Sequence, residues 1–274
     1  MNKYQHRARF NENRLAVLDI ETIVEDMPEG GFPPWCMHSP IVCSILTADL
    51  DTHGIWAFAI ESIRFEEHDD PLGAIDDLLA GRSCITYNGR GFDLPVLALT
   101  AQKLRYFALE ALRAVATEPR FESARHYDVA DHSSHFGAAR MVSLEHLCRE
   151  LDIPAKLDVH GDEVGTLYAE GRIDEIVAYC SGDVCATLLA FAHRYAFETS
   201  NEEYFGSLTA QFARWVRQTQ DQHLQPFAEI DELDRLLGCS LRGQLDAARA
   251  NAKADADRQE QRRIDASFGE ASRY

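Results

Sequence analysis

The sequence is short of positive charge. Its 274 residues include 27 Lys and Arg against 45 Asp and Glu, which gives a formal net charge of -18 at pH 7. A protein that holds nucleic acid mainly by neutralising phosphates is usually basic, so this balance argues against that mode of binding. The argument weakens if some of the acids hold divalent cations, because a bound metal reverses the local sign of the field.

Two other absences bear on the class of protein. There is no run of about 18 apolar residues, so we expect no membrane-spanning helix, and residues 1–14 lack the apolar stretch of a secretory signal. The seven cysteines are odd in number and form no CxxC pair, which argues against a zinc site or a disulfide framework and favours a reducing cytoplasm. Hydrophobic residues make up 46% of the chain, which is enough to build a packed core.

Hydrophobic patterning predicts an α/β fold, with a mixed sheet flanked by helices. Strands are expected at 14–24, 41–50, 54–62 and 83–89, with a short strand opening into a loop over 126–136. Helices are expected at 71–80, 94–104, 143–151 and 173–197. Strands with hairpin character come first, and helices and strands then alternate, which is typical of a mixed sheet with helices on its faces.

The hydrophobic patterning and composition of the sequence change near residue 200. Residues 205–244 have the pattern of an amphipathic helix pair, and residues 245–274 are charged with few large apolar side chains. We therefore expect one domain over 1–200, followed by a helical appendage and a charged tail over 201–274.

The stretch AVLDIET, at 16–22, places two acids in what is otherwise a buried strand. Residues i and i+2 of a strand point to the same face, so Asp19 and Glu21 project together. Such a pair can simply reach water at the end of a strand, which is the usual fate of charged groups. Alternatively, it supplies the oxygen ligands that a hard cation such as Mg²⁺ requires.

Two further stretches carry acids in suitable settings. Asp93 follows the turn residues 88–91 and directly precedes a predicted helix, which is also the position of a simple N-cap. Tyr179 and Asp183 lie one helical turn apart on one face. Taken alone, Tyr179 can be a boundary aromatic with a wet hydroxyl, and Asp183 a solvated charge.

Together the three stretches resemble the motifs of the DEDD superfamily of 3′→5′ exonucleases. The order D-x-E, N-G-x-x-F-D-x-P and Y-x-x-x-D is similar to the DEDDy branch, above all to the exonuclease domain of family B DNA polymerases and related stand-alone bacterial proteins. The DEDDh branch has His five residues before the last Asp, where this chain has Ala178. The resemblance extends over about residues 14–197.

The resemblance implies a ribonuclease H-like fold, in which a five-stranded mixed sheet is flanked by helices. It also implies a two-metal phosphodiesterase site that uses Mg²⁺ or Mn²⁺. The implied metal ligands are Asp19, Glu21, Asp93 and Asp183, and the implied catalytic residues are these four with Tyr179. A tyrosine with a pKa of about 10 is a poor base near neutrality, so Tyr179 is expected to orient the attacking water.

Asn88, Arg90 and Phe92 are expected to contact the substrate, although Phe92 can equally pack in the core and Arg90 can be an ordinary surface charge. The expected substrate is the 3′ end of single-stranded DNA, and the expected products are nucleoside 5′-monophosphates. RNA or short oligonucleotides are an alternative substrate, and a catalytically silent nucleic-acid-binding scaffold is an alternative function.

No membrane partner is expected, while residues 205–274 could recruit a protein. Neither Asp128 nor Asp131 is expected to bind metal, and His132 and His135 are expected to be ordinary surface histidines in a loop.

Overall fold

A five-stranded mixed sheet forms the centre of the computed structural model, which describes residues 10–25, 32–154, 163–229 and 233–271. The strands are β1 (Arg14–Ile23), β2 (Ser39–Leu50), β3 (Trp56–Arg64), β4 (Ser83–Thr86) and β5 (His126–Asp128). Their order is β3-β2-β1-β4-β5. The pairs β1–β2 and β2–β3 are antiparallel, while β1–β4 and β4–β5 are parallel. The predicted ribonuclease H-like α/β fold is thus confirmed.

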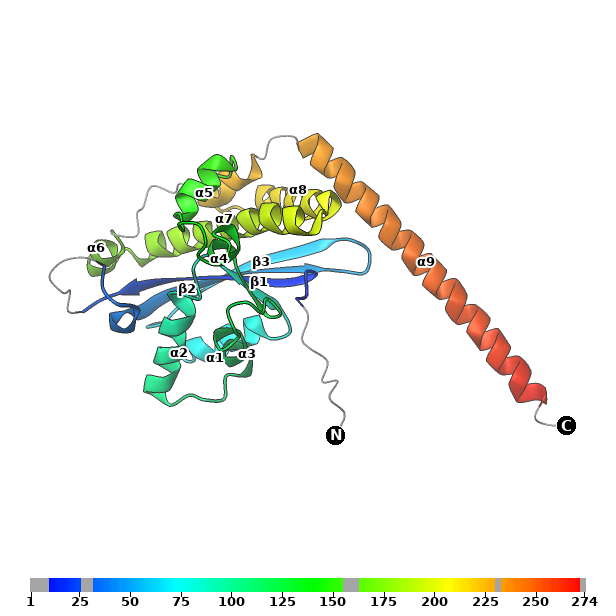
Figure 1. The fold of residues 1–274 in the computed structure, drawn as a ribbon, viewed down its shortest axis with the longest axis horizontal. Helices are drawn as coiled ribbons and strands as arrows, with labels where there is room; N and C mark the ends of the chain where they lie inside the picture. The colour runs from blue at the N-terminus through cyan, green and yellow to red at the C-terminus, as the bar shows by residue number, and fades with distance from the viewer. Residues whose placement is uncertain (1–9, 26–31, 155–162, 230–232, 272–274) are drawn as a thin grey trace.

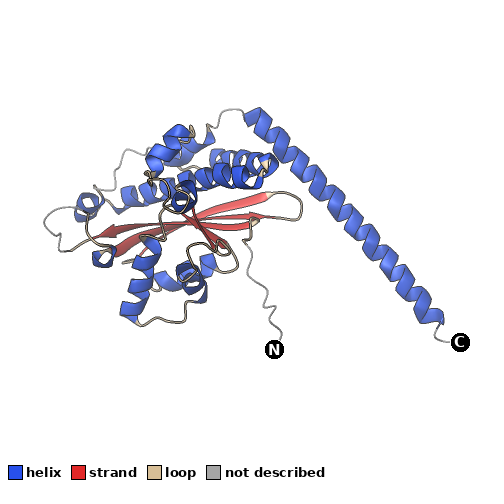
Figure 2. Cartoon of the chain, viewed as in Figure 1, coloured by secondary structure: helices blue, strands red, loops and turns tan. Residues whose placement is uncertain are grey.

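Helices cover both faces of the sheet (Figure 1, Figure 2). One face carries α4 (Val129–Ser133), α5 (Leu144–Glu150), α6 (Val164–Ala169), α7 (Ile173–Thr199) and α8 (Glu202–Gln218). The other face carries α1 (Pro71–Leu79), α2 (Asp93–Leu104) and α3 (Glu110–Ala116). Two short 3-10 helices, η1 (Trp35–Met37) and η2 (Gln222–Ala228), lie in connections.

The alternation of side chains along β1 divides the core into layers. Leu15 and Val17 belong to the cluster that α7 and α8 complete. Leu18 and Ile20 belong to the cluster beneath, which α1 and α2 complete. Because the side chains of a strand alternate between its faces, Asp19 and Glu21 point toward α7. The alternation along β1 therefore places both acids on the face of the sheet that α7 covers.

Helix α4 departs from the sequence prediction. Residues 126–136 are expected to open into a loop, but a short helix forms directly after β5. Asp128 caps this helix, because its Oδ1 accepts a hydrogen bond from the Ala130 N–H at 3.0 Å. A carboxylate at the N-cap satisfies backbone donors that would otherwise be left unpaired, and this stabilises a helix too short to be predicted from periodicity.

Helix α7 is long and apolar enough to cross a membrane by length and composition alone, with a mean hydropathy of 1.4 in its most apolar window. The sequence predicts no such helix. In the structure 72% of that window is buried within the protein. Val184, Leu188 and Phe191 belong to the same core cluster as Leu15 and Val17 of β1. Packing against the sheet therefore accounts for its hydropathy.

The hydrophobic core continues past residue 200. Tyr204, Leu208 and Phe212 of α8 belong to the same cluster as Leu15 of β1. The division into domains at residue 200 stays a prediction. The packing nevertheless joins α8 to the sheet.

A long helix, α9 (Leu233–Ala271), follows and extends away from the sheet (Figure 1). Its contact with the turn between β2 and β3 includes a hydrogen bond of 2.6 Å from Asn251 Nδ2 to the Thr52 carbonyl. Residues 245–271 are helical, whereas the sequence predicts a tail there. This stretch is rich in Ala, Arg, Gln and Asp, and the high helix propensity of Ala, Arg and Gln outweighs the lack of large apolar side chains.

Candidate active site

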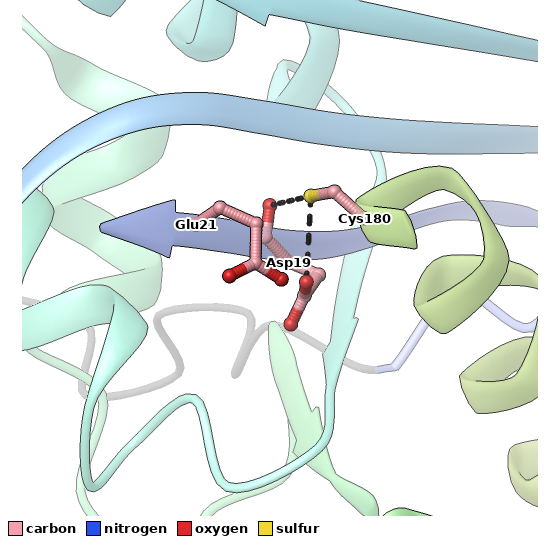
Figure 3. Close-up of side chains that lie close together, drawn as sticks. All are labelled: Asp19, Glu21 and Cys180. Atoms are coloured by element: carbon pink, nitrogen blue, oxygen red, sulfur yellow. Dashed lines mark hydrogen bonds between the residues drawn. The ribbon is translucent and has the colours of Figure 1, made fainter. Parts of the chain in front are cut away.

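Asp19 and Glu21 lie near the carboxyl end of β1, where both are half-buried. The register between β1 and β2 shifts between Glu21 and Thr22, and such an irregularity commonly re-aims side chains next to functional sites. Cys180 of α7 reaches down to the strand, with its Sγ 3.4 Å from Oδ2 of Asp19 and 3.5 Å from the Asp19 carbonyl (Figure 3). The thiol therefore contacts the first acid of the pair.

Asp93 comes to the same place from the start of α2. Its Oδ1 accepts a hydrogen bond from the Ile20 N–H at 3.1 Å, which fastens it to β1 between Asp19 and Glu21. The N-cap of α2 is Phe92 and has no side-chain cap. The interpretation of Asp93 as a simple N-cap is wrong, because its carboxylate accepts a hydrogen bond from strand β1.

Helix α7 supplies Tyr179 and Asp183, one turn apart on the face toward β1. Burial raises the pKa of Asp183, and a hydrogen bond from the Tyr179 hydroxyl offsets part of that rise. Burial raises the pKa of Tyr179, and the charges of Asp183, Glu21 and Asp19 raise it further. Tyr179 therefore stays protonated near neutral pH and acts as a hydrogen-bond donor.

The four acids from three distant segments lie close enough to perturb one another. Burial raises the pKa of Asp19 well above its ordinary value, followed by the charges of Asp93, Asp183 and Glu21. Burial and the charges of Asp183 and Asp93 raise the pKa of Glu21 in the same way. Burial raises the pKa of both Asp93 and Asp183 to about 7.

No Lys or Arg forms an ion pair with any of these four acids in the described parts of the chain. Clustered carboxylates that are half or fully buried and lack cationic partners are costly. Divalent cations would supply the missing charge, and carboxylate oxygens are the ligands that Mg²⁺ and Mn²⁺ prefer. Asp19, Glu21, Asp93 and Asp183 thus fit as ligands of such cations.

The turn before Asp93 is held by Asp128 of β5. Its carboxylate oxygens accept hydrogen bonds from the backbone N–H groups of Asn88 and Arg90, both at 2.9 Å. Asn88 has a φ of 60°, and a Cβ on Gly89 would lie 2.5 Å from the Thr86 side chain, so the turn demands glycine there. Asp128 lies near the site as a support for the turn.

The three residues expected to touch substrate differ in their surroundings. The Arg90 guanidinium donates from Nη1 to the Glu118 carbonyl at 2.6 Å, and its Nε lies 3.4 Å from Asp131 Oδ2. Phe92 is half-buried against the lower core, and its ring meets the His38 ring edge-on with centroids 4.8 Å apart. Substrate contact by Asn88, Arg90 and Phe92 stays a prediction.

Sequence reasoning missed Cys180, because no second cysteine lies at a motif spacing that would draw attention to it. It was wrong about His132, whose ring stacks on Tyr127 with centroids 3.6 Å apart. His132 Nδ1 also lies 3.0 Å from Glu198 Oε1. The reason is α4, which turns His132 toward α7, while His135 is exposed as predicted.

A family model matches residues 31–230 of this chain. Its description is a predicted 3′-5′ exonuclease related to the exonuclease domain of PolB. The chain belongs to this family. The exonuclease is therefore a hydrolase that acts on nucleic acid, and domains of this kind generally use divalent metals. The matched segment begins after β1, so Asp19 and Glu21 join the site through the geometry described above.

Among solved structures, the exonuclease is similar to the family B DNA polymerase from the hyperthermophilic archaeon Pyrobaculum calidifontis, with 15% identity and a TM-score of 0.48. The similarity covers 85% of this chain and 28% of the polymerase chain. No curated protein is found to match.

Proposed function

We propose that this exonuclease removes nucleotides from the 3′ end of single-stranded DNA by a two-metal mechanism and releases nucleoside 5′-monophosphates. The observation that carries the proposal is the convergence of Asp19, Glu21, Asp93 and Asp183 from β1, α2 and α7. These acids repel one another and have no cationic partner among the described residues. Family membership supplies the nucleic-acid substrate and the polarity.

The proposal assigns a role to each of these side chains. Asp19 would hold the cations together with the three other acids, whose charges all act on it. Glu21, Asp93 and Asp183 would supply the remaining carboxylate ligands. When bound, the cations stabilise charge on the attacking and leaving oxygens of the displacement.

Tyr179 has a positioning task for the attacking water. Its raised pKa excludes it as a base near neutral pH. Its hydroxyl, already directed at Asp183, can hold a water beside that carboxylate. The pairing of β1 with β2, which includes Asp19 opposite Ser44 and Glu21 opposite Val42, keeps the first two acids in place while the reaction proceeds.

The direct test is digestion of single-stranded DNA and RNA, labelled at either end, with Mg²⁺, Mn²⁺ or a chelator. We expect 3′-labelled DNA to release its label at once as a mononucleotide and 5′-labelled DNA to shorten stepwise, with neither reaction in chelator. Faster digestion of RNA than of DNA would show that RNA is the preferred substrate. Release of a 5′ label as a mononucleotide would contradict the polarity, and no digestion with any metal would favour the silent scaffold.

A further inference from the structure

Cys180 places a thiol where hard-cation chemistry requires only oxygen ligands. Mg²⁺ and Mn²⁺ are held by oxygen, whereas thiolates select softer cations such as Zn²⁺. Cys180 is fully buried in α7 and directs its sulfur at Asp19, beside Glu21 (Figure 3). The candidate active site therefore includes a soft donor within its carboxylates.

The spacing of these three side chains matches that of metal ligands. One ligand atom from each of Asp19, Glu21 and Cys180 lies within 4.8 Å of the others. In tetrahedral zinc sites, bonds of about 2.3 Å to sulfur and about 2.1 Å to oxygen separate those two ligands by about 3.6 Å. The observed distance from Cys180 Sγ to Asp19 Oδ2 is 3.4 Å. A cation can thus be held with little movement of either group.

We propose that Asp19, Glu21 and Cys180 form a mixed carboxylate–thiolate site that captures zinc-class cations, Zn²⁺ and Cd²⁺, and that this capture blocks hydrolysis by occupying two carboxylates of the active site. On binding, the S–H bond of Cys180 breaks, the sulfur donates its electron pair to the cation, and the proton leaves to water. No group is oxidised or reduced. The blocking effect depends on the proposed function, whereas the capture does not.

The other cysteines of the described chain supply controls. Cys36 is exposed in η1 and tests for binding by an accessible thiol. Cys185 lies on the same helix as Cys180, but the two thiols belong to different core clusters. A signal that depends on Cys180 and on Asp19 together therefore identifies the three-ligand site.

The test is titration of the metal-free protein with Cd²⁺, followed by the ultraviolet charge-transfer band of the sulfur–cadmium bond, with no nucleic acid present. We expect one saturating site in the wild type and in Cys36→Ser. Cys180→Ser should lose the band and bind Cd²⁺ at least about tenfold more weakly. Asp19→Asn, which keeps the thiol, should also bind at least about tenfold more weakly, since loss of even an outer-shell partner costs that much.

A band that persists in Cys180→Ser, or that disappears in Cys36→Ser, would overturn the proposal. Unchanged affinity in Asp19→Asn would reduce it to binding by a lone thiol and overturn it equally. Circular dichroism confirms folding, and Cys180→Ala replaces the serine variant if that variant does not fold.

The same proteins separate the two proposals in digestion assays. Zn²⁺ should lower the digestion rate in both proteins. The factor by which it lowers the rate should be at least about tenfold larger in the wild type than in Cys180→Ser. If the cadmium band depends on Cys180 but the protein shows no Mg²⁺-dependent digestion, only the proposed function is contradicted. If the protein digests DNA but its cadmium band does not depend on Cys180, only this inference is contradicted.

Discussion

The middle and the C-terminal end of α7 each place an acid beside a tyrosine hydroxyl, with opposite results for the pKa of the acid. Near its middle, Asp183 accepts a hydrogen bond from Tyr179, and burial still raises its pKa to about 7. Near its C-terminus, Glu198 accepts from Tyr127 at 2.8 Å, yet its pKa is lowered to about 2 although burial opposes the shift. The two acids thus occupy one helix in very different electrostatic states.

The difference lies in the partners. Glu198 also accepts a hydrogen bond from Arg194 Nε at 2.8 Å and contacts His132 Nδ1. The charged groups near Asp183 are other acids. An acid paired with a cation, as Glu198 is with Arg194, stabilises the structure, while a buried acid without one costs free energy of folding. Such an acid indicates a site for a cation that the chain does not itself provide. Five measurements sharpen or break this comparison.

The largest effect is expected when an acid that lacks a cationic partner is removed. Asp183→Asn and Asp19→Ala should each lower the rate of hydrolysis at least about 10³-fold, because the charge stabilisation supplied by the cations is worth several kcal/mol. The free energy of unfolding of the metal-free protein at pH 8 should not fall, since repulsion is relieved. Single-turnover digestion and denaturant unfolding measure the two quantities. Wild-type rates in either variant would remove that residue from the site.

Metal affinity should rise with pH. The raised pKa values mean that the folded, metal-free protein holds protons on Asp93 and Asp183 up to a pH of about 7. The stabilisation these protons give is lost as the pH rises through that value, and metal binding must displace them below it. If both protons leave, Mn²⁺ should bind about 10²-fold more tightly at pH 8 than at pH 6. Calorimetric titration at both values tests this, and equal affinities would contradict the assigned pKa shifts.

Tyr179→Phe should slow hydrolysis about 10²-fold and leave Mn²⁺ affinity at pH 8 nearly intact, because the hydroxyl positions water and holds no cation. The hydroxyl also lowers the pKa of Asp183. Its loss should therefore move the pH midpoint of metal binding upward. Parallel kinetic and calorimetric measurements separate these effects, and equal losses of rate and affinity would show that Tyr179 has another role.

Glu198→Gln is the matched change at the partnered end of α7. It should lower the free energy of unfolding at pH 7 by about 1–2 kcal/mol, since the charged hydrogen bond from Arg194 is lost. Hydrolysis should be unchanged. Thermal or denaturant unfolding beside a digestion assay tests both expectations. A loss of activity with normal stability would mean that this end of α7 also serves the reaction.

The smallest effect is expected for an exposed acid. Asp255 of α9 pairs with Arg258 one turn away, and both side chains are about two-thirds exposed, at 66% and 64%. Asp255→Ala should change the free energy of unfolding by less than about 0.5 kcal/mol. Denaturant unfolding of this variant gives the baseline against which Glu198→Gln is judged, and a larger change would show that exposure does not weaken the pair.

Much of the fold was predictable because its signals are local. The alternation in 14–24 identifies β1 and the shared face of Asp19 and Glu21, and the apolar stripe in 173–197 identifies α7. Turn residues around 88–91 place Asp93 at the start of a helix. Each of these inferences uses residues within one or two turns of each other, where the geometry of a strand or helix decides the answer.

The remainder depends on contacts between distant segments. No spacing shows that Asp93 bonds to the Ile20 N–H, that Cys180 reaches Asp19, or that Arg90 turns toward Asp131 and away from solvent. The partners of Glu198 come from β5, α4 and α7 itself. Local patterns can thus name candidate acids, while only the tertiary structure shows which of them have a counter-charge.

Helix α9 gives the protein a hydrodynamic signature. At a rise of about 1.5 Å per residue, its 39 residues extend about 58 Å. A fully compact chain of 274 residues has a radius of gyration of only about 19 Å. With such an arm, the molecule diffuses more slowly and scatters X-rays over longer interatomic distances than a sphere of equal mass. It therefore sweeps a wider volume of solution than its chain length indicates.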